Sequence, residues 1–384
     1  MNSIKTASAF VEALFKQQLG VSINFRELYG ADFFPHYEES KRNEEASCSI
    51  CINHNMEVLM NLYNRVLVDK EAKGRAIIHY MLFYVYIESE AYDSAEEHLR
   101  AFQKELSSWQ LDELEDEKER LVVQVLFIIL HEAYHILFHL KPEIKEQCLD
   151  EEISRQKDIQ GEWEYLWQSA KAEGRGFILN EARRNASILI PQELPSDMKT
   201  EMMDEVLKEV VKNVIKPDDY DDLVNGNAPV LLEELACDRL AWVYLMEHFK
   251  TQGIEENELL QMHYWAYIAL NALDLDKAYN SWYRPIIHEK TQFDIKGVLL
   301  RHKSFSSLVR HYIVSDEAKL SLEYKQITKQ VEEMFNEMSE NLYKNREELK
   351  SLYQPRDDES EIDYDREKLL KSEMDKIAKP LLGA

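Results

Sequence analysis

The chain has 384 residues, 45% of them hydrophobic, and its 46 Lys and Arg against 72 Asp and Glu give a formal charge of −26. This length can bury a sizeable core, and the hydrophobic content excludes a disordered chain. The negative charge would repel nucleic acid and anionic lipid, so neither is an expected partner, and a solvated acidic surface explains it better than a site for basic substrates.

The four cysteines are too few for a disulfide framework, and the first twenty residues lack the basic and then apolar layout of a signal peptide. We therefore expect a cytoplasmic location. Cys48, Cys51 and His54 are spaced like one half of a structural zinc site, but no second Cys/His pair of suitable spacing follows. Two thiols without a metal are the favoured interpretation.

Helix should dominate, because apolar residues recur at three- and four-residue spacing and only 10 Gly and 9 Pro interrupt the chain. Residues 1–108 form a predicted N-terminal helical region, with a long helical stretch at 76–102. A short strand is possible at 20–25, and the polar residues 35–49 are expected to form a loop. Any sheet in this chain should be small.

Residues 109–280 form the predicted core of the protein. The acidic stretch 109–120 leads into an apolar helix, a helical insertion occupies about 141–229, and another helix begins near Val230. Within the insertion, residues 176–191 offer a second possible strand.

Residues 281–384 form a predicted C-terminal helical region. Its acidic stretch 353–376 is expected to be a partly mobile tail.

The apolar stretch "LFIILHEAYHILFHL" at 126–140 contains the motif HExxH. His131 and His135 are four residues apart, so on a helix both imidazoles point to the same side and two nitrogens can share one ion. Glu132 stands where a carboxylate can act on a water molecule at the metal without being a ligand. The uncharged residues between and around the histidines are typical of a helix buried beneath a catalytic cleft.

His139 is a tempting third ligand, but it follows His131 by eight residues, which is about 12 Å of rise on a continuous helix. One zinc cannot span that distance with bonds of about 2 Å. No glycine turns the chain before His139, so we expect a core histidine or one that supports a ligand from outside.

The third ligand is better sought in "LLEELACDRLAW" at 231–242, another apolar stretch that carries acids. Glu234 and Asp238 are one helical turn apart, so Glu234 can bind the ion while Asp238 accepts a hydrogen bond from a ligating histidine. Glu233 is rotated by about 100° and should face elsewhere. The alternative is that both acids are ordinary surface residues.

The sequences "HEAYH" and "ELACD" together resemble the gluzincin class of zinc metallopeptidases, whose pattern is HExxH followed by ExxxD on a second helix. The resemblance implies that His131, His135 and Glu234 hold Zn²⁺, that Glu132 is the general base and that Asp238 orients a histidine. It also implies a multi-helical zincin-like core, mostly α with at most a small β-sheet, flanked by helical regions. Through HExxH alone the chain is also similar to the phage-exclusion (Lit-type) peptidases, which act on a host translation factor.

The expected function is that of a zinc-dependent endopeptidase acting on an intracellular protein. A donor must stabilise the oxyanion that develops on the substrate, and His263 in "QMHYWAYIAL" is our candidate, with a packing role as its alternative. The competing function is an inactive helical interaction module that retains the zinc-binding fold. A DNA-linked regulator ranks last, because the acidic chain offers no basic recognition helix.

Overall fold

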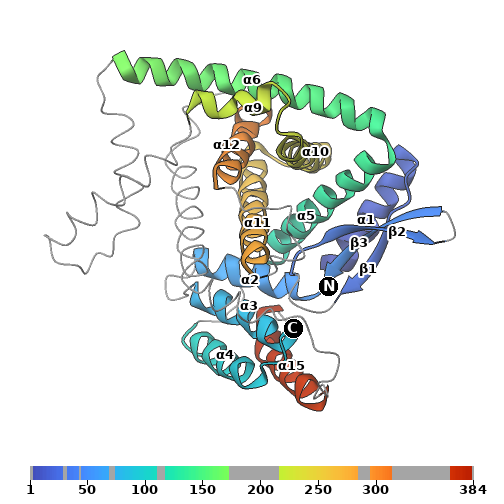
Figure 1. Ribbon diagram of the computed structural model, residues 1–384, viewed down its shortest axis with the longest axis vertical. Coiled ribbons are helices and arrows are strands. Elements are labelled where there is room, and N and C mark those ends of the chain that lie inside the picture. Colours follow the sequence, from blue (N-terminus) through green and yellow to red (C-terminus); the bar gives the residue numbers. More distant parts are fainter. Residues whose placement is uncertain are drawn as a thin grey trace, which may run out of the picture. The chain divides into compact units, whose positions relative to one another are not determined.

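A computed structural model describes residues 3–28, 33–42, 45–68, 74–109, 117–172, 216–283, 295–313 and 364–382 (Figure 1). Within these ranges helices dominate and one three-stranded sheet is present, which confirms a mostly α fold with a small sheet. The possible strand at 176–191 lies outside the described residues. Contacts divide the chain into two compact units, 1–140 with 240–293 and 316–384, and 141–239 with 294–315.

The first unit is organised around one long helix, α5, which contacts three other helices and two strands of the sheet. The elements described in this unit are α1 (Ser3–Leu14), the π-helical turn η1 (Phe15–Leu19), β1 (Asn24–Leu28), β2 (His36–Arg42), β3 (Glu45–Asn53), α2 (Asn55–Val68), α3 (Arg75–Glu88), α4 (Tyr92–Leu106), α5 (Glu117–Leu140), the part of α10 (Pro229–Thr251) from Leu240 on, α11 (Glu256–Tyr283), α15 (Tyr364–Ala378) and the 3-10 turn η4 (Lys379–Leu382).

Helix α5 is apolar on nearly every face because it is enclosed by the rest of the first unit. Phe127, Ile128, Ile129 and Leu130 are fully buried, and α1, α2 and α11 pack against the helix together with β2 and β3. Residues 118–140 are long and apolar enough to cross a bilayer, but 94% of their most apolar window is buried within the protein. The core helix of a globular protein has the same length and composition, so this helix is weak evidence of a membrane span.

The sheet has the order β1-β3-β2, with β1 parallel and β2 antiparallel to β3. The prediction of a loop at 35–49 is wrong, since most of this stretch belongs to β2 and β3. The sequence "HYEESKR" of β2 lacks the alternating apolar residues by which strands are recognised. Such polar composition is tolerated because β2 is an edge strand.

The helical stretch expected at 76–102 is confirmed and consists of α3 and α4, separated by a turn in which Glu90 adopts a φ of 58°. Another sequence prediction needs correction. The tail expected at 353–376 is helical where the structure describes it, because α15 buries Leu370 and Met374 and lies against α4. Buried apolar residues thus outweigh the acidic composition that suggested mobility.

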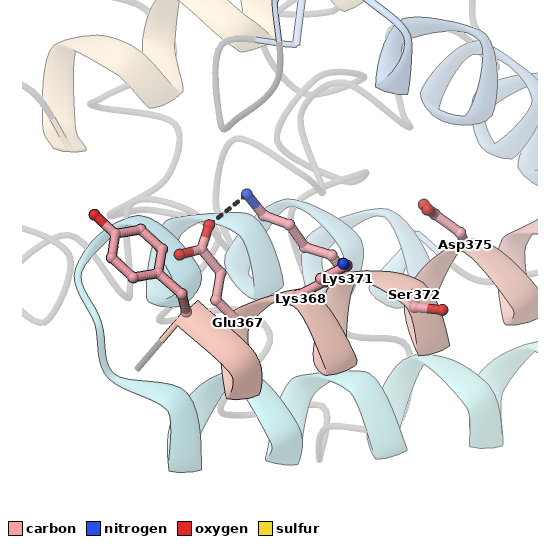
Figure 2. A pocket seen from close by; sticks show the side chains of 6 residues that line it. Glu367, Lys368, Lys371, Ser372 and Asp375 are labelled. Atoms are coloured by element: carbon pink, nitrogen blue, oxygen red, sulfur yellow. Dashed lines mark hydrogen bonds and ion pairs between the residues drawn. The ribbon is translucent and has the colours of Figure 1, made fainter. Parts of the chain in front are cut away.

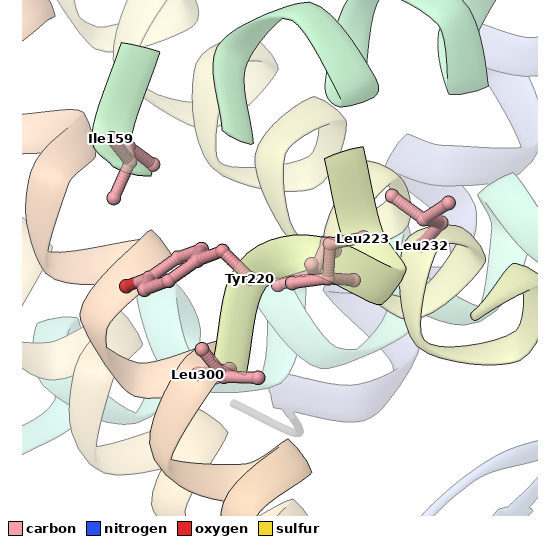
Figure 3. Close-up of a cluster of buried hydrophobic side chains, with 6 residues drawn as sticks. Ile159, Tyr220, Leu223, Leu232 and Leu300 are labelled. Atoms are coloured by element: carbon pink, nitrogen blue, oxygen red, sulfur yellow. The ribbon is translucent and has the colours of Figure 1, made fainter. Parts of the chain in front are cut away.

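The second unit has its own apolar core, built from helices far apart in the sequence. Its elements are α6 (Pro142–Ala172), the 3-10 turn η2 (Pro217–Tyr220), α9 (Asp221–Val224), the first part of α10 (Pro229–Thr251) and α12 (Ile295–Tyr312). Side chains from all five elements form one buried cluster of Ile159, Tyr220, Leu223, Leu232, Leu235 and Leu300 (Figure 3). Helix α10 begins at Pro229, which agrees with the start expected near Val230.

The buried amides of Asn64 on α2 and Gln124 on α5 form a reciprocal pair, with N···O distances of 2.9 and 2.8 Å. We expect Asn64→Leu to destabilise the protein by about 1–3 kcal/mol, because the amide of Gln124 would lose its partner without regaining water. Urea unfolding measures this loss.

The double variant Asn64→Leu/Gln124→Met is the matched control, since it leaves no buried amide behind. Its loss of stability should be smaller than the sum of the two single losses. Additive losses would show that the amide pair is not what stabilises this helix contact.

Candidate metal centre

The two histidines of HExxH meet on one side of α5. The Nε2 atoms of His131 and His135 are 3.2 Å apart, and the rings are steeply tilted at 77°. Two ligands on a tetrahedral zinc with bonds of 2.0–2.1 Å would be about 3.3–3.4 Å apart, so the pair already has nearly the separation that one ion requires. The same distance also fits an N–H···N hydrogen bond between the rings.

The histidine pair is enclosed by the protein. His131 is 1% exposed and His135 and Glu132 are each 8% exposed, and the ring of Tyr37 from β2 stacks on His135 at a centroid distance of 5.8 Å. A stacked aromatic ring restricts rotation of the imidazole and excludes water from that side. The motif glutamate therefore sits in a protected environment next to the first histidine.

Glu234 and Asp238 lie one turn apart on α10 and are both contacted by one arginine. Arg301 of α12 donates to both carboxylate oxygens of Asp238, at 2.6 and 2.7 Å, and its Nη2 is 3.3 Å from Glu234 Oε2. Arg301 and Asp238 are almost completely buried, so the bidentate pair holds both side chains in fixed positions. Sequence analysis does not anticipate Arg301, because its 63-residue separation from Asp238 leaves no local pattern.

His131 and His135 belong to the first unit, and Glu234, the third ligand that the sequence predicts, belongs to the second unit. Two imidazole nitrogens and one carboxylate oxygen are a donor set that zinc accepts, with a fourth position open to water or substrate. Glu233, the preceding residue on α10, pairs with Lys145 at 2.5 Å.

Arg239, the residue after Asp238, has separate partners on α6. Its Nε donates to Glu152 at 2.8 Å, and Glu152 is fully buried. Burial alone would lower the pKa of Arg239, but the carboxylate of Glu152 outweighs it and the pKa is raised. The guanidinium of Arg239 thus faces the carboxylate of Glu152 inside the second unit, and sequence patterns do not predict this pair.

His139 and His263 occupy opposite environments. His139 is exposed at the end of α5, so the expectation of a core histidine is wrong. The apolar residues beside it suggested burial, but the last turn of α5 is exposed to solvent. His263 on α11 is 1% exposed and packs on the rings of Trp242 and Tyr267. Its burial among aromatic rings favours the packing role over that of an oxyanion donor, which stays a prediction.

Two pockets in the described part of the chain offer no comparable site. One is lined by a single helix, α15, where Lys371 donates to Glu367 at 2.7 Å (Figure 2). The other lies in the second unit beside Gly226. Neither lining contains a histidine or a cysteine, so neither offers the ligands that a transition metal prefers.

Comparisons with known proteins leave the family open. The chain matches no protein-family model, no curated protein and no solved structure at a significant level. The resemblance to gluzincins therefore depends on the five motif residues, and their arrangement must carry any functional argument.

Because burial lowers the pKa of His263, the stability of the folded protein should decrease as the pH falls. A histidine whose pKa is raised by an acidic partner has the opposite effect on stability. Burial lowers the pKa of His263 from 6.5 to about 3, so the folded protein keeps the imidazole neutral while the unfolded chain gains a proton below pH 6.5. Stability from the neutral ring is therefore complete above pH 6.5 and decreases as the pH falls toward 3. At pH 5 the wild type should have lost about 2 kcal/mol through this group.

His263→Phe removes the titrating group and keeps an aromatic ring in the same place. The fall in the free energy of unfolding between pH 7 and pH 5 should be smaller in this variant than in the wild type, by urea titration at each pH. Equal falls would show that His263 is not held neutral in the folded state.

Proposed function

We propose that the protein is a zinc-dependent endopeptidase that cleaves an intracellular protein. The observation that carries this proposal is the His131 and His135 pair, whose Nε2 atoms are 3.2 Å apart on a buried helix. Two imidazoles withdrawn from water are costly unless a partner compensates them, and zinc is the partner that suits this separation. Glu234 is the proposed third ligand, because of its place in the ExxxD motif.

Glu132 is the proposed general base. It follows His131 directly and is 8% exposed, so few water molecules compete with substrate for its carboxylate. Glu132 would take a proton from the attacking water and pass it to the departing amine of the peptide. A bound zinc ion would lower the pKa of that water to about 7 and polarise the peptide carbonyl.

Arg301 has a positioning role in this proposal. Its guanidinium binds both oxygens of Asp238 and approaches only one oxygen of Glu234, at 3.3 Å. The second oxygen of Glu234 can then serve as a metal ligand while the arginine fixes the direction of the carboxylate. In the gluzincin resemblance Asp238 orients a histidine; here both of its oxygens accept from Arg301, so the role proposed for the pair is to position Glu234.

The alternative proposal is an inactive interaction module that keeps the metal-binding fold. The buried histidine pair suits both proposals, because each can bind zinc. They differ in Glu132, which is needed for hydrolysis but not for binding a partner.

The zinc content of two variants should distinguish a histidine that binds the metal from one on the same helix that does not. We expect His135→Ala to bind one zinc fewer per chain than His139→Ala, because His139 is an exposed histidine four residues along α5. Elemental analysis after dialysis against a zinc buffer measures both.

The acids of α10 offer a second matched comparison. Glu234→Gln should lose the same zinc, whereas Glu233→Gln removes only the pair with Lys145. Equal zinc content in all four variants would refute the proposed ligand set.

Replacing Glu132 with Gln should leave zinc content unchanged and abolish hydrolysis, with a loss of at least about a hundredfold expected for a general base. The measurement is a proteomic comparison of cells that produce the wild type, Glu132→Gln or Glu119→Gln. Glu119 is an exposed acid on the same helix and serves as the control.

A cleavage product present with the wild type and Glu119→Gln but absent with Glu132→Gln supports the peptidase. A product that persists with Glu132→Gln contradicts the assigned base. Partner binding that survives Glu132→Gln, without any cleavage product, favours the interaction module.

A further inference from the structure

A second group of metal-binding side chains lies on the sheet of the first unit. His36 on β2 is paired directly with Cys51 on β3 in antiparallel register, and Glu38 follows His36 by two residues. Side chains two apart on a strand, and side chains paired across strands, share one face of a sheet. The ligand atoms of these three residues all lie within 4.8 Å of one another.

The group is accessible to an ion from solvent although its cysteine is buried. The side chains of His36 and Glu38 are 41% and 43% exposed, whereas Cys51 is completely buried. One oxygen of Glu38 is 3.5 Å from His36 Nε2, and the other is 3.1 Å from the guanidinium of Arg26 on β1. Oε2 of Glu38 can therefore stay paired with Arg26 while Oε1 of Glu38 binds an ion.

The thiol and the carboxylate already interact. A hydrogen bond between Cys51 and Glu38 is the main reason that the pKa of Glu38 lies below its ordinary value. Burial opposes this effect, and the neighbouring His36 and Arg26 add to it. A thiol, an imidazole and a carboxylate form a donor set that selects zinc and related transition metals over calcium or magnesium. Ligand atoms around one tetrahedral ion are about 3.3–3.8 Å apart. The ligand atoms of His36, Glu38 and Cys51 would therefore have to move together by about 1 Å to bind the same ion.

We propose that His36, Glu38 and Cys51 bind a second transition-metal ion, of the zinc class, at the edge of the sheet. On binding, the thiol of Cys51 loses its proton to solvent, and the three side chains join β2 to β3 through the ion. The fourth position faces solvent and is left for water.

The CxxC spacing of Cys48 and Cys51 does not describe this site. On a strand, the side chains of residues three apart point to opposite faces, so Cys48 and Cys51 cannot both be ligands of one ion. His54 pairs instead with Glu27 on β1, at 3.4 Å. The partners of Cys51 come from β2, where the sequence predicts a loop, and this is why sequence analysis does not find them.

Cobalt substitution tests the site, because thiolate-bound Co²⁺ has a charge-transfer absorption in the near ultraviolet that sites with only nitrogen and oxygen ligands lack. The purified full chain, reduced and freed of metal with a chelator, is titrated with Co²⁺. We expect this absorption in the wild type and in Cys48→Ser once enough Co²⁺ has been added to fill both proposed sites. Cys51→Ser should abolish the absorption, and His36→Ala should weaken Co²⁺ binding at this site by more than about tenfold.

Glu38→Gln is a second test that leaves the buried thiol in place, and circular dichroism verifies that each variant is folded. It should also weaken the cobalt absorption at a given Co²⁺ concentration. His135→Ala should retain the full absorption, which separates this site from the proposed peptidase centre. The proposal is overturned if the wild type shows no thiolate absorption, or if folded Cys51→Ser retains it.

Discussion

The withdrawal of α5 from water is the constraint on which the rest of the first unit depends. Almost all of its apolar length is enclosed by other helices and by the sheet, so each polar group on it must find its partner inside the protein. Gln124 satisfies this requirement through Asn64. The Nε2 atoms of His131 and His135 are 3.2 Å apart, close enough for both to bind one ion.

Buried charge is organised by the same principle in the second unit. Asp238 and Arg239 are adjacent on α10, and because successive residues on a helix are rotated by about 100°, they face different neighbours. Arg301 of α12 binds Asp238, and Glu152 of α6 binds Arg239. Each charge has an opposite charge within hydrogen-bond distance, which offsets the cost of removing both from water. The two pairs together fix the rotation of α10, and therefore the direction of Glu234.

Much of this arrangement can be predicted from the spacing of residues in the sequence, and part of it cannot be predicted in this way. The four-residue intervals of His131 and His135, and of Glu234 and Asp238, place each pair on one helix face, as periodicity predicts. Arg301 and Glu152 are found only in the fold, since they pair with α10 across 63 and 87 residues. Strand β2 escapes prediction because its side chains are mostly polar on both faces, and the exposure of His139 depends on where the end of α5 emerges into solvent.

Strand β2 presents opposite faces to the two proposed metal sites. Tyr37 stacks on His135, while its neighbours His36 and Glu38 point to the other face, where Cys51 lies. An edge strand with polar residues is held mainly by its hydrogen bonds to one neighbour, so it is among the less stable parts of a fold. An ion that joins β2 to β3 would reduce the motion of Tyr37 and so restrict the imidazole beneath it. A shift of β2 by one residue would exchange the two faces and remove Tyr37 from His135, so one strand register sets the geometry of both.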